Sequence, residues 1–329
     1  MLQTIRQVGI FGSGKYLPEK ILSNLELAKM VDTSDEWIVS RTGIRERRIA
    51  PEGVTCCDLA VEAGRLALAD AGVKPEEVDL VLLGTITPDT ILPAASCLVQ
   101  QKLGCTRAFA FDLTAACTGF VYGITTAWQY IATGQCDTVL VIGAEVLSRV
   151  MDYTDRSTCV IFGDGAGAFV LRPTQGEHRL LAACLGSEGN EEVMSIPASG
   201  SRCPASHATV DGRQHFVKMK GNSIFRFAVK TMVDVVEQVC EKIGCKVSDI
   251  DLLVPHQVNQ RILETSSEKL GLPISKFYVN IEKYGNTSAA SVPIAFDEAW
   301  KAGRLETGDL VVIVAFGGGL TWGAVAVRW

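Results

Sequence analysis

Short apolar runs alternate along this chain with longer segments in which apolar residues recur every three or four positions. The short runs are bounded by turn residues, so they predict buried strands at residues 78–85, 108–113 and 138–143. The periodic segments predict helices at residues 59–71, 93–103 and 120–133. Strands that alternate with helices of this length are typical of α/β proteins, in which helices cover mostly parallel sheets.

Two capping sequences predict further short helices near the N-terminus. Ser23 is followed by Glu26, and Thr33 is followed by Glu36. A hydroxyl residue with a glutamate three positions later can satisfy unpaired N–H groups in the first turn of a helix. We therefore expect one helix to begin after Ser23 and another after Thr33.

The pattern of the first half of the chain returns in the second half. Residues 71–84 run from a helix end through a glycine and a polar turn into a Val-Asp-Leu strand, and residues 243–254 follow the same course. Residues 160–171 and 314–327 also match, but at a different spacing. Internal similarity at unequal spacing indicates a diverged duplication. We expect two similar halves around a shared centre, residues 1–174 and 175–329.

Composition limits the classes of function. The chain has 329 residues, of which 47% are hydrophobic and 21% are charged, so much of it must be buried. Its net charge of −6 argues against a general attraction to nucleic acid or to an anionic membrane. No apolar stretch approaches the roughly 20 residues of a membrane span. We expect neither a nucleic acid nor a membrane as a partner.

The 11 cysteines do not form a disulfide or zinc pattern. Their number is odd, many of them lie within apolar periodic segments, and no C-x-x-C pair occurs. Reduced thiols of this kind are typical of the cytosol. We expect a cytoplasmic protein without a bound metal ion.

Cys117 is the cysteine whose position suits chemistry. It follows the strand-like run 108–113 after a few small residues and precedes the helix predicted at 120–133. The positive end of a helix dipole and its unpaired N–H groups favour the thiolate, which is the nucleophilic form. Most free cysteines, however, are small buried hydrophobes. Cys117 is therefore a candidate nucleophile only if other residues support it.

Among the four histidines, His256 has the position best suited to chemistry. It follows the apolar strand predicted at residues 250–254 and precedes a helix, and α/β proteins hold reactive groups at such strand ends. The alternative is a structural histidine at the end of a strand. His178 and His207 lie in polar sequence and should be exposed, whereas His215 lies in a strand-like run.

Asn286 is the third candidate. Its sequence, Gly-Asn-Thr-Ser, is also a good turn and N-cap sequence, so a structural role is the alternative. The duplication, however, places Asn286 in the second half where Cys117 stands in the first. His256 follows the strand that answers to residues 78–85. Three polar side chains would then converge from related loops.

Three consecutive glycines, Gly317 to Gly319, precede Leu-Thr-Trp near the end of the chain. Backbone without side chains can approach a ligand closely and direct its N–H groups at one point. Beside a thiolate, this is the design of an oxyanion hole. A tight turn between the last two strands is the other interpretation, and the two are compatible.

With Cys117, His256, Asn286 and the glycine run, the chain resembles the β-ketoacyl-[acyl-carrier-protein] synthase III family of the thiolase superfamily over essentially its whole length. Residues 34–45, 155–167 and 255–259 contribute to this resemblance. It implies a homodimer with the duplicated αβαβα fold, in five layers with two mixed sheets. It also implies an acyltransferase that initiates type II fatty-acid synthesis from a short acyl-CoA and malonyl-acyl carrier protein. The coenzyme A thioester is then a substrate, and no cofactor is implied.

The resemblance also implies roles for single residues. Cys117 would take the acyl group, and the backbone N–H groups of Cys117 and Gly318 would form the oxyanion hole. His256 and Asn286 would donate hydrogen bonds to the enolate that forms when the malonyl group loses CO₂. The residues implied in coenzyme A binding are Trp37, Arg41, Arg156, Gly221 and Asn259.

The resemblance also implies which residues bind the carrier protein and which residue limits the size of the primer. The family's carrier protein is acidic, so we expect a local basic patch that includes Arg226, Arg261 and Lys269. Each of these is alternatively an ordinary solvated charge. Leu92 occupies a place where some family members carry a phenylalanine that the partner subunit inserts into the acyl pocket. Its smaller side chain predicts room for longer or branched primers.

Neighbouring families leave an alternative function open. Thiolases use a second cysteine near the C-terminal glycines, whereas this chain has no cysteine after Cys245. Elongating synthases carry a second histidine where this chain has Asn286. Plant-type polyketide synthases share the Cys-His-Asn set. The alternatives are therefore a related acyltransferase of secondary metabolism with the same triad, or a catalytically silent acyl-CoA-binding subunit.

Overall fold

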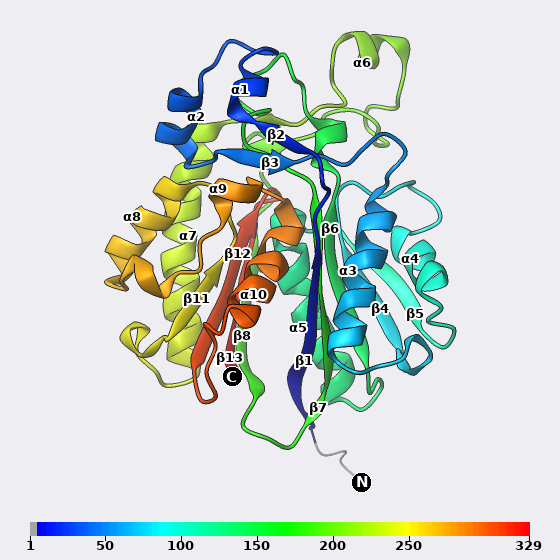
Figure 1. The fold of residues 1–329 in the computed structure, drawn as a ribbon, viewed down its shortest axis with the longest axis vertical. Coiled ribbons are helices and arrows are strands. Elements are labelled where there is room, and N and C mark those ends of the chain that lie inside the picture. Colours follow the sequence, from blue (N-terminus) through cyan, green and yellow to red (C-terminus); the bar gives the residue numbers. More distant parts are fainter. Residues whose placement is uncertain (1–4) are drawn as a thin grey trace.

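The computed structural model describes residues 5–329 and contains two mixed β-sheets with matching strand orders (Figure 1). In order across the first sheet, the strands are β1 (Gln7–Tyr16), β7 (Gly165–Thr174), β6 (Val139–Glu145), β4 (Leu80–Gly84) and β5 (Phe109–Leu113). Across the second sheet they are β8 (Arg179–Ser187), β13 (Thr321–Arg328), β12 (Leu310–Gly317) and β11 (Leu252–Pro255).

The two sheets repeat each other in strand direction as well as in order. In each, two antiparallel pairings are followed by a parallel one, so β6 beside β4 corresponds to β12 beside β11. The counterpart of β5 is reduced to a single parallel bridge between Leu253 and Phe277. The predicted duplication is confirmed. The chain passes from one sheet to the other at residues 175–178, where we predicted the boundary between halves.

Helices and sheets form five layers. The outer layer on the first sheet consists of α3 (Cys56–Asp70) and α4 (Ala95–Leu103). The central layer, between the sheets, consists of α5 (Gly119–Ala132) and α10 (Ser291–Lys301). The outer layer on the second sheet consists of α7 (Gly221–Lys242) and α8 (Gln260–Leu270). The predicted α/β fold with two mixed sheets in an αβαβα arrangement is therefore confirmed.

The main hydrophobic core surrounds the central helices. Phe120 of α5, Phe169 of β7 and Phe296 of α10 are fully buried, and the ring of Phe169 lies 4.8 Å and 4.7 Å from the other two ring centres. Tilted aromatic pairs at this distance add to the stabilisation that burial provides. The core therefore fixes α5 and α10, the two helices that follow Cys117 and Asn286, relative to each other.

The predicted strands and helices occur within a few residues of their expected positions, with one error at a cap. Ser23 forms the expected capping box with Glu26 and begins α1 (Asn24–Leu27). Thr33 does not cap the next helix; the Ser34 side chain accepts a hydrogen bond from the Trp37 N–H, so α2 spans Asp35–Thr42. The short strands β2 (Ile21–Ser23) and β3 (Glu46–Arg48) pair beside these helices.

The remaining short elements are β9 (Met194–Ser195), α6 (His207–Asp211), β10 (Lys218–Met219) and α9 (Ile281–Tyr284). Of these, α6 lies at the same end of the molecule as α1 and α2, and α9 lies beside β3 (Figure 1). Strand β9 pairs with β10, which places Met194 above the ends of the central strands. None of the helices within residues 5–329 is long and apolar enough to cross a membrane.

Candidate active site

Cys117 lies in a tight turn between β5 and α5. The turn spans Ala116–Thr118 and forms one 3-10 turn before α5 begins at Gly119. Ala116 has a φ of +46°, a strained conformation for a residue other than glycine. The turn leaves Cys117 only 6% exposed, facing a small pocket. This pocket also contains His256, Asn286, Gly317 and Gly318.

The second half contains a matching turn, but Asn286 is not the residue that matches Cys117. The turn Ser288–Ala290 precedes α10 as Ala116–Thr118 precedes α5, and Ser288 has a φ of +51°. Ala289 therefore corresponds to Cys117, and Asn286 lies three residues earlier. The predicted match of Asn286 to Cys117 was therefore wrong by three residues. Asn286 still reaches the pocket, because the loop before the turn also faces it.

The resting form of Cys117 is the neutral thiol. Burial raises the pKa of this thiol to about 12; a hydrogen bond with Ser288 lowers the pKa, and the Glu145 carboxyl raises it. Loss of hydration in the closed pocket therefore opposes the preference for the thiolate that a helix N-terminus provides. As a nucleophile, Cys117 would have to lose its proton during the reaction.

A buried carboxyl group lies at the end of β6, below the pocket. Glu145 accepts hydrogen bonds from Thr87 Oγ1 at 2.6 Å, from Thr85 Oγ1 at 3.2 Å and from the Ile86 N–H at 3.2 Å. Burial raises the pKa of Glu145 to about 7, although these hydrogen bonds and Ser288 lower it. Glu145 thus changes charge near neutral pH, close to Cys117.

His256 is a buried, neutral histidine. It follows β11, is 1% exposed, and burial lowers the pKa of its ring to about 3. Its Nδ1 lies 2.9 Å from Ser291 Oγ, while its buried Nε2 has no hydrogen-bond partner within the described residues. The ring packs edge-on against Phe316, with 5.6 Å between ring centres. A neutral ring with one nitrogen free in the pocket suits a hydrogen bond to a reacting group.

The residue after His256 fixes the local backbone. The Gln257 side chain donates to the carbonyls of Pro255 and Tyr278, at 2.8 and 3.0 Å. It accepts from the N–H groups of Asn280 and Ile281, at 3.0 and 3.2 Å. Four hydrogen bonds from one buried amide therefore hold the segment before Asn286 against the end of β11.

Asn286 has a fixed amide orientation. Its Oδ1 accepts the Ser288 N–H at 2.8 Å, and the side chain is 3% exposed. The amide NH₂ group is therefore the half of the side chain left for the pocket. The backbone of Asn286 exchanges hydrogen bonds with Ile161 and Gly163, so the residue is anchored to the other half of the chain.

Both interpretations of the glycine run hold. Residues 318–320 form the turn between β12 and β13, and Gly317 and Gly318 also line the pocket of Cys117. Gly317 packs directly on the backbone of Cys117, since a Cβ there would lie 2.8 Å from the Cys117 nitrogen. A residue larger than glycine at position 317 would therefore displace Cys117.

Three of the residues implied in coenzyme A binding form a cluster on the surface. The guanidinium carbons of Arg41 and Arg156 lie 4.8 and 5.3 Å from the ring centre of Trp37. Asn259 Nδ2 donates to the Arg41 carbonyl at 3.0 Å, which ties α2 to the start of α8. An aromatic face beside two guanidinium groups suits a purine that carries phosphates.

A second cavity adjoins the pocket of Cys117. Gly221 and Asn259 line it together with Asn286 and Met194, and the last two also line the pocket of Cys117. The cavity has a volume of about 100 Å³. Two of the five predicted coenzyme A residues, Gly221 and Asn259, therefore line a cavity next to the predicted catalytic residues.

The remaining predicted residues lie outside the pocket. Leu92 is 86% exposed and does not line the pocket of Cys117 in this chain. Arg226 on α7 and Arg261 and Lys269 on α8 are all exposed. Arg261 adjoins Asn259, whereas Lys269 lies roughly 12 Å farther along α8, at 1.5 Å per residue.

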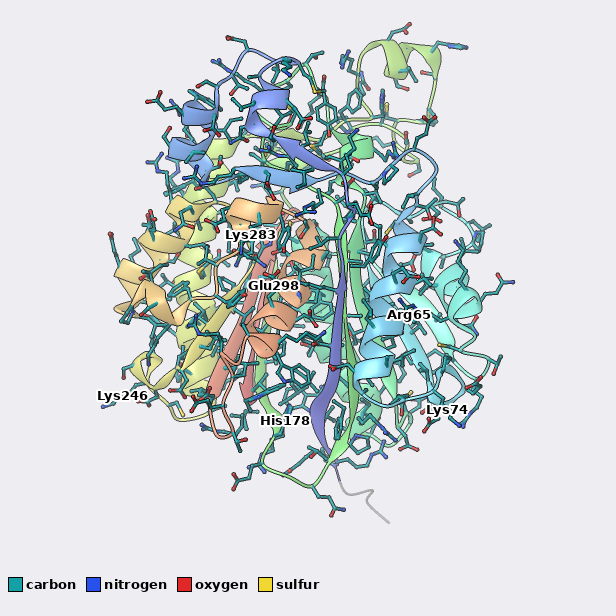
Figure 2. The ribbon with its side chains drawn as sticks, in the orientation of Figure 1. Arg65, Lys74, His178, Lys246, Lys283 and Glu298 are labelled. Atoms are coloured by element: carbon teal, nitrogen blue, oxygen red, sulfur yellow. The ribbon has the colours of Figure 1, made fainter. Side chains whose placement is uncertain are left out.

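The other three histidines do not approach the site. His207 is exposed, as expected. His178 is half-buried rather than exposed, because its ring packs 4.1 Å from that of Trp329 at the far end of the molecule (Figure 2). His215 lies in a turn rather than in a strand.

Several residues that shape the site were not predicted. Ser288 and Ser291 lie in the Asn-Thr-Ser-Ala-Ala-Ser sequence, and their hydroxyl groups were a signal for hydrogen bonds to buried partners. Glu145 is the one charged residue in the apolar run 138–145. A lone carboxylate at a strand end could have been considered on the same ground as His256.

Comparisons with known proteins agree with the geometry. Two family models match the chain: 3-oxoacyl-[acyl-carrier-protein] synthase III over residues 111–189, and its C-terminal counterpart over residues 240–329. The chain is similar to the β-ketoacyl-[acyl-carrier-protein] synthase III of Symbiobacterium thermophilum, with 53% identity over 326 residues that cover 99% of each protein.

Solved structures show the same similarity. The chain resembles 3-oxoacyl-[acyl-carrier-protein] synthase III from Aquifex aeolicus VF5, with a TM-score of 0.91 and 46% identity over 98% of this chain and 100% of that one. It also resembles the priming β-ketosynthase of the R1128 polyketide pathway, with a TM-score of 0.91 and 34% identity over 99% and 98% of the two chains.

Proposed function

Because the chain belongs to the 3-oxoacyl-[acyl-carrier-protein] synthase III family of condensing acyltransferases, we propose that it joins the acyl group of a short acyl-CoA to malonyl-acyl carrier protein. The reaction releases CO₂ and gives a 3-oxoacyl-acyl carrier protein, which initiates type II fatty-acid synthesis. One observation carries this proposal: Cys117, His256, Asn286 and the glycine turn share a single buried pocket.

In the first step, Cys117 Sγ attacks the carbonyl carbon of acyl-CoA. A new C–S bond forms, the bond to the coenzyme A sulfur breaks, and the thiol proton passes to the departing sulfur. The backbone N–H groups of Cys117 and Gly318 would stabilise the oxyanion. Trp37, Arg41 and Arg156 would hold the nucleotide end of coenzyme A, with Gly221 and Asn259 along its pantetheine arm.

In the second step, malonyl-acyl carrier protein replaces coenzyme A. Its terminal C–C bond breaks, CO₂ departs, and the resulting enolate carbon attacks the acyl carbon on Cys117. The Cys117 sulfur leaves as a thiolate and takes up a proton from water, which restores the thiol. His256 and Asn286 would donate hydrogen bonds to the enolate oxygen, on which charge develops. A neutral imidazole and an amide suit this task in a dry pocket, whereas a carboxylate would repel the charge.

We also propose that the active protein is a homodimer. Strand β5 is one of the two edges of the first sheet and pairs with no further strand within residues 5–329, and Phe109 on it is 44% exposed beside Phe111 and Tyr130. An apolar open edge of this kind favours pairing with another chain. Nearby, Leu92 is 86% exposed, as expected of a side chain that enters the partner's acyl pocket.

Two further proposals follow from surface and thiol chemistry. Arg226 and Arg261 are exposed, each next in sequence to a residue that lines the second cavity, and would meet the acidic carrier protein, with Lys269 farther along α8. All 11 cysteines are free in the described chain, which supports the reducing cytoplasm as its location.

Product analysis tests the proposed function. The protein is incubated with malonyl-acyl carrier protein and a panel of straight and branched acyl-CoA primers, and the carrier protein is weighed by intact mass spectrometry. We expect a 3-oxoacyl adduct with at least one short primer. Absence of this adduct with every primer, while the malonyl carrier remains intact, would refute the proposal. The β-ketoacyl-[acyl-carrier-protein] synthase III of Symbiobacterium thermophilum is 53% identical to this chain and the polyketide priming enzyme is 34% identical, which supports fatty-acid synthesis over the secondary-metabolism alternative.

A further inference from the structure

The role of His256 depends on which ring nitrogen carries its single proton. With the proton on Nε2, the ring presents a hydrogen-bond donor to the pocket. With the proton on Nδ1, it presents a base that could deprotonate Cys117. Because Nε2 faces the pocket without a partner, the contacts of Nδ1 decide between these forms.

Ser291 contacts Nδ1 and has only one way to satisfy its own hydrogen. Its Oγ accepts the Gln257 backbone N–H at 2.7 Å and lies 2.9 Å from His256 Nδ1. The side chain is 2% exposed, and Nδ1 is the only acceptor recorded for its hydroxyl hydrogen within residues 5–329. If Nδ1 carried the proton, the Ser291 hydrogen would be buried without an acceptor, which is costly.

Asn286 is oriented in the same sense by a different contact. Its Oδ1 accepts the Ser288 N–H at 2.8 Å, so the donor half of the amide remains for the pocket. Ser288 lies in the turn that precedes α10, and Ser291 is the first residue of α10. One short segment, residues 288–291, therefore orients both His256 and Asn286.

We propose that Ser291 is a positioning residue that donates its hydroxyl hydrogen to His256 Nδ1 and thereby keeps the ring proton on Nε2. His256 and Asn286 then present only donors to the pocket, as an enolate oxygen requires. The same arrangement prevents His256 from accepting the Cys117 proton. The low pKa of the buried ring supports this arrangement, because the cationic form, with a proton on both nitrogens, is not populated at neutral pH. The tautomer follows from the hydrogen bonds of Ser291 and does not depend on the reaction, whereas its role in catalysis rests on the proposed function.

Nitrogen NMR on the free protein tests the tautomer directly. With ¹⁵N-labelled histidine, the four rings give a small set of signals, and a His256→Gln variant identifies those of His256. At neutral pH we expect Nε2 of His256 to show the shift and the attached hydrogen of a protonated nitrogen, and Nδ1 to show neither. A proton on Nδ1 would overturn the proposal, whether or not any variant folds.

Variants then test the role of the hydroxyl group. Ser291→Ala should give mixed tautomers and slow release of CO₂ from malonyl-acyl carrier protein by about tenfold or more, while acylation of Cys117 stays within about twofold of wild type. Ser291→Thr, which keeps the hydroxyl, should restore the Nε2 tautomer and most of the rate. Ser96→Ala removes another fully buried serine hydroxyl, one without a partner in the described chain, and should change neither.

The outcomes separate the two proposals. An unchanged tautomer and an unchanged CO₂ release rate in Ser291→Ala would overturn the positioning role. A wild-type protein with the expected tautomer but without a condensation product would refute the proposed function alone.

Discussion

Gly317 and Cys117 touch through their backbones: a Cβ added to Gly317 would lie 2.8 Å from the Cys117 nitrogen and 3.0 Å from its Cβ. The last residue of β12 therefore limits the position of Cys117, the proposed nucleophile, in the other half of the chain. Because the backbone atoms of Cys117 belong to a short turn between β5 and α5, they cannot move aside as a flexible side chain can.

A Gly317→Ala substitution should therefore displace Cys117 and slow its acylation by at least about tenfold, since a misplacement of 1 Å can cost about 100-fold. The rate of acyl-Cys117 formation from acyl-CoA, followed by intact mass, measures this effect. Gly189→Ala is the matched control, because a Cβ there meets no atom within 4 Å. Equal acylation rates in the two variants would show that the close approach does not matter.

Glu145 should make the stability of the protein depend on pH. Burial raises its pKa from 4.5 to about 7, so the folded protein binds more protons than the unfolded chain between these values. The free energy of unfolding should then fall as pH rises from about 4.5 to about 7 and change no further above that, by roughly 3 kcal/mol in all. Glu145→Gln should lack this decrease.

Urea unfolding of the wild type and of Glu145→Gln at pH 5 and pH 8 measures the difference. The glutamine is neutral at both pH values. The difference in unfolding free energy between the two proteins therefore removes the contributions of all other titratable groups. Parallel behaviour of the two proteins would contradict the assignment of a raised pKa to Glu145.

Arg156 should contribute to acyl-CoA binding through its contact with Trp37. Its removal in Arg156→Ala should raise KM for acyl-CoA about fivefold and leave KM for malonyl-acyl carrier protein unchanged, because a guanidinium group beside a bound purine contributes about 1 kcal/mol at an exposed site. Steady-state kinetics with each substrate varied in turn measure both constants. Arg202→Ala, which removes an exposed arginine paired with Glu191, should change neither; a similar increase there would indicate a general charge effect.

The proposed dimer should depend on the open edge of the first sheet. A charge placed there by Phe109→Glu should shift the protein to a monomer, because burying an unpaired carboxylate against an apolar partner is costly. Light scattering after size-exclusion chromatography reports the mass. Phe11→Glu is the control, since Phe11 on β1 is 42% exposed, close to the 44% of Phe109. A dimer that survives in Phe109→Glu but not in Phe11→Glu would place the interface elsewhere.

The sequence predicted the layers of this fold well because burial imposes a local pattern. The apolar run before Glu145 and the periodic segment after Cys117 each reflect their own environment, so strand and helix were recognisable without tertiary contacts. The repeat of these patterns also revealed the duplication, although not the exact match of Cys117 to Ala289. That match depends on a backbone turn that the sequence pattern does not encode.

The chemistry of the site was predicted in part. Cys117, His256 and Asn286 were recognisable from their positions after strands and before helices, and from the family resemblance. The contact of Ser291 with His256 joins residues 35 positions apart, and the raised pKa of Cys117 depends on burial by elements from both halves. Neither follows from local sequence, because each is a property of the packed molecule.

The separation of the two half-reactions tests the central claim most directly. Wild type, Cys117→Ser, His256→Ala and Asn286→Ala are each exposed to acyl-CoA and weighed, then supplied with malonyl-acyl carrier protein labelled in its free carboxyl group, and the released CO₂ is counted. We predict that both His256→Ala and Asn286→Ala acylate Cys117 as wild type does but release CO₂ about 100-fold more slowly, whereas Cys117→Ser gains no acyl group. Loss of acylation in His256→Ala or Asn286→Ala, with CO₂ release retained, would contradict the account.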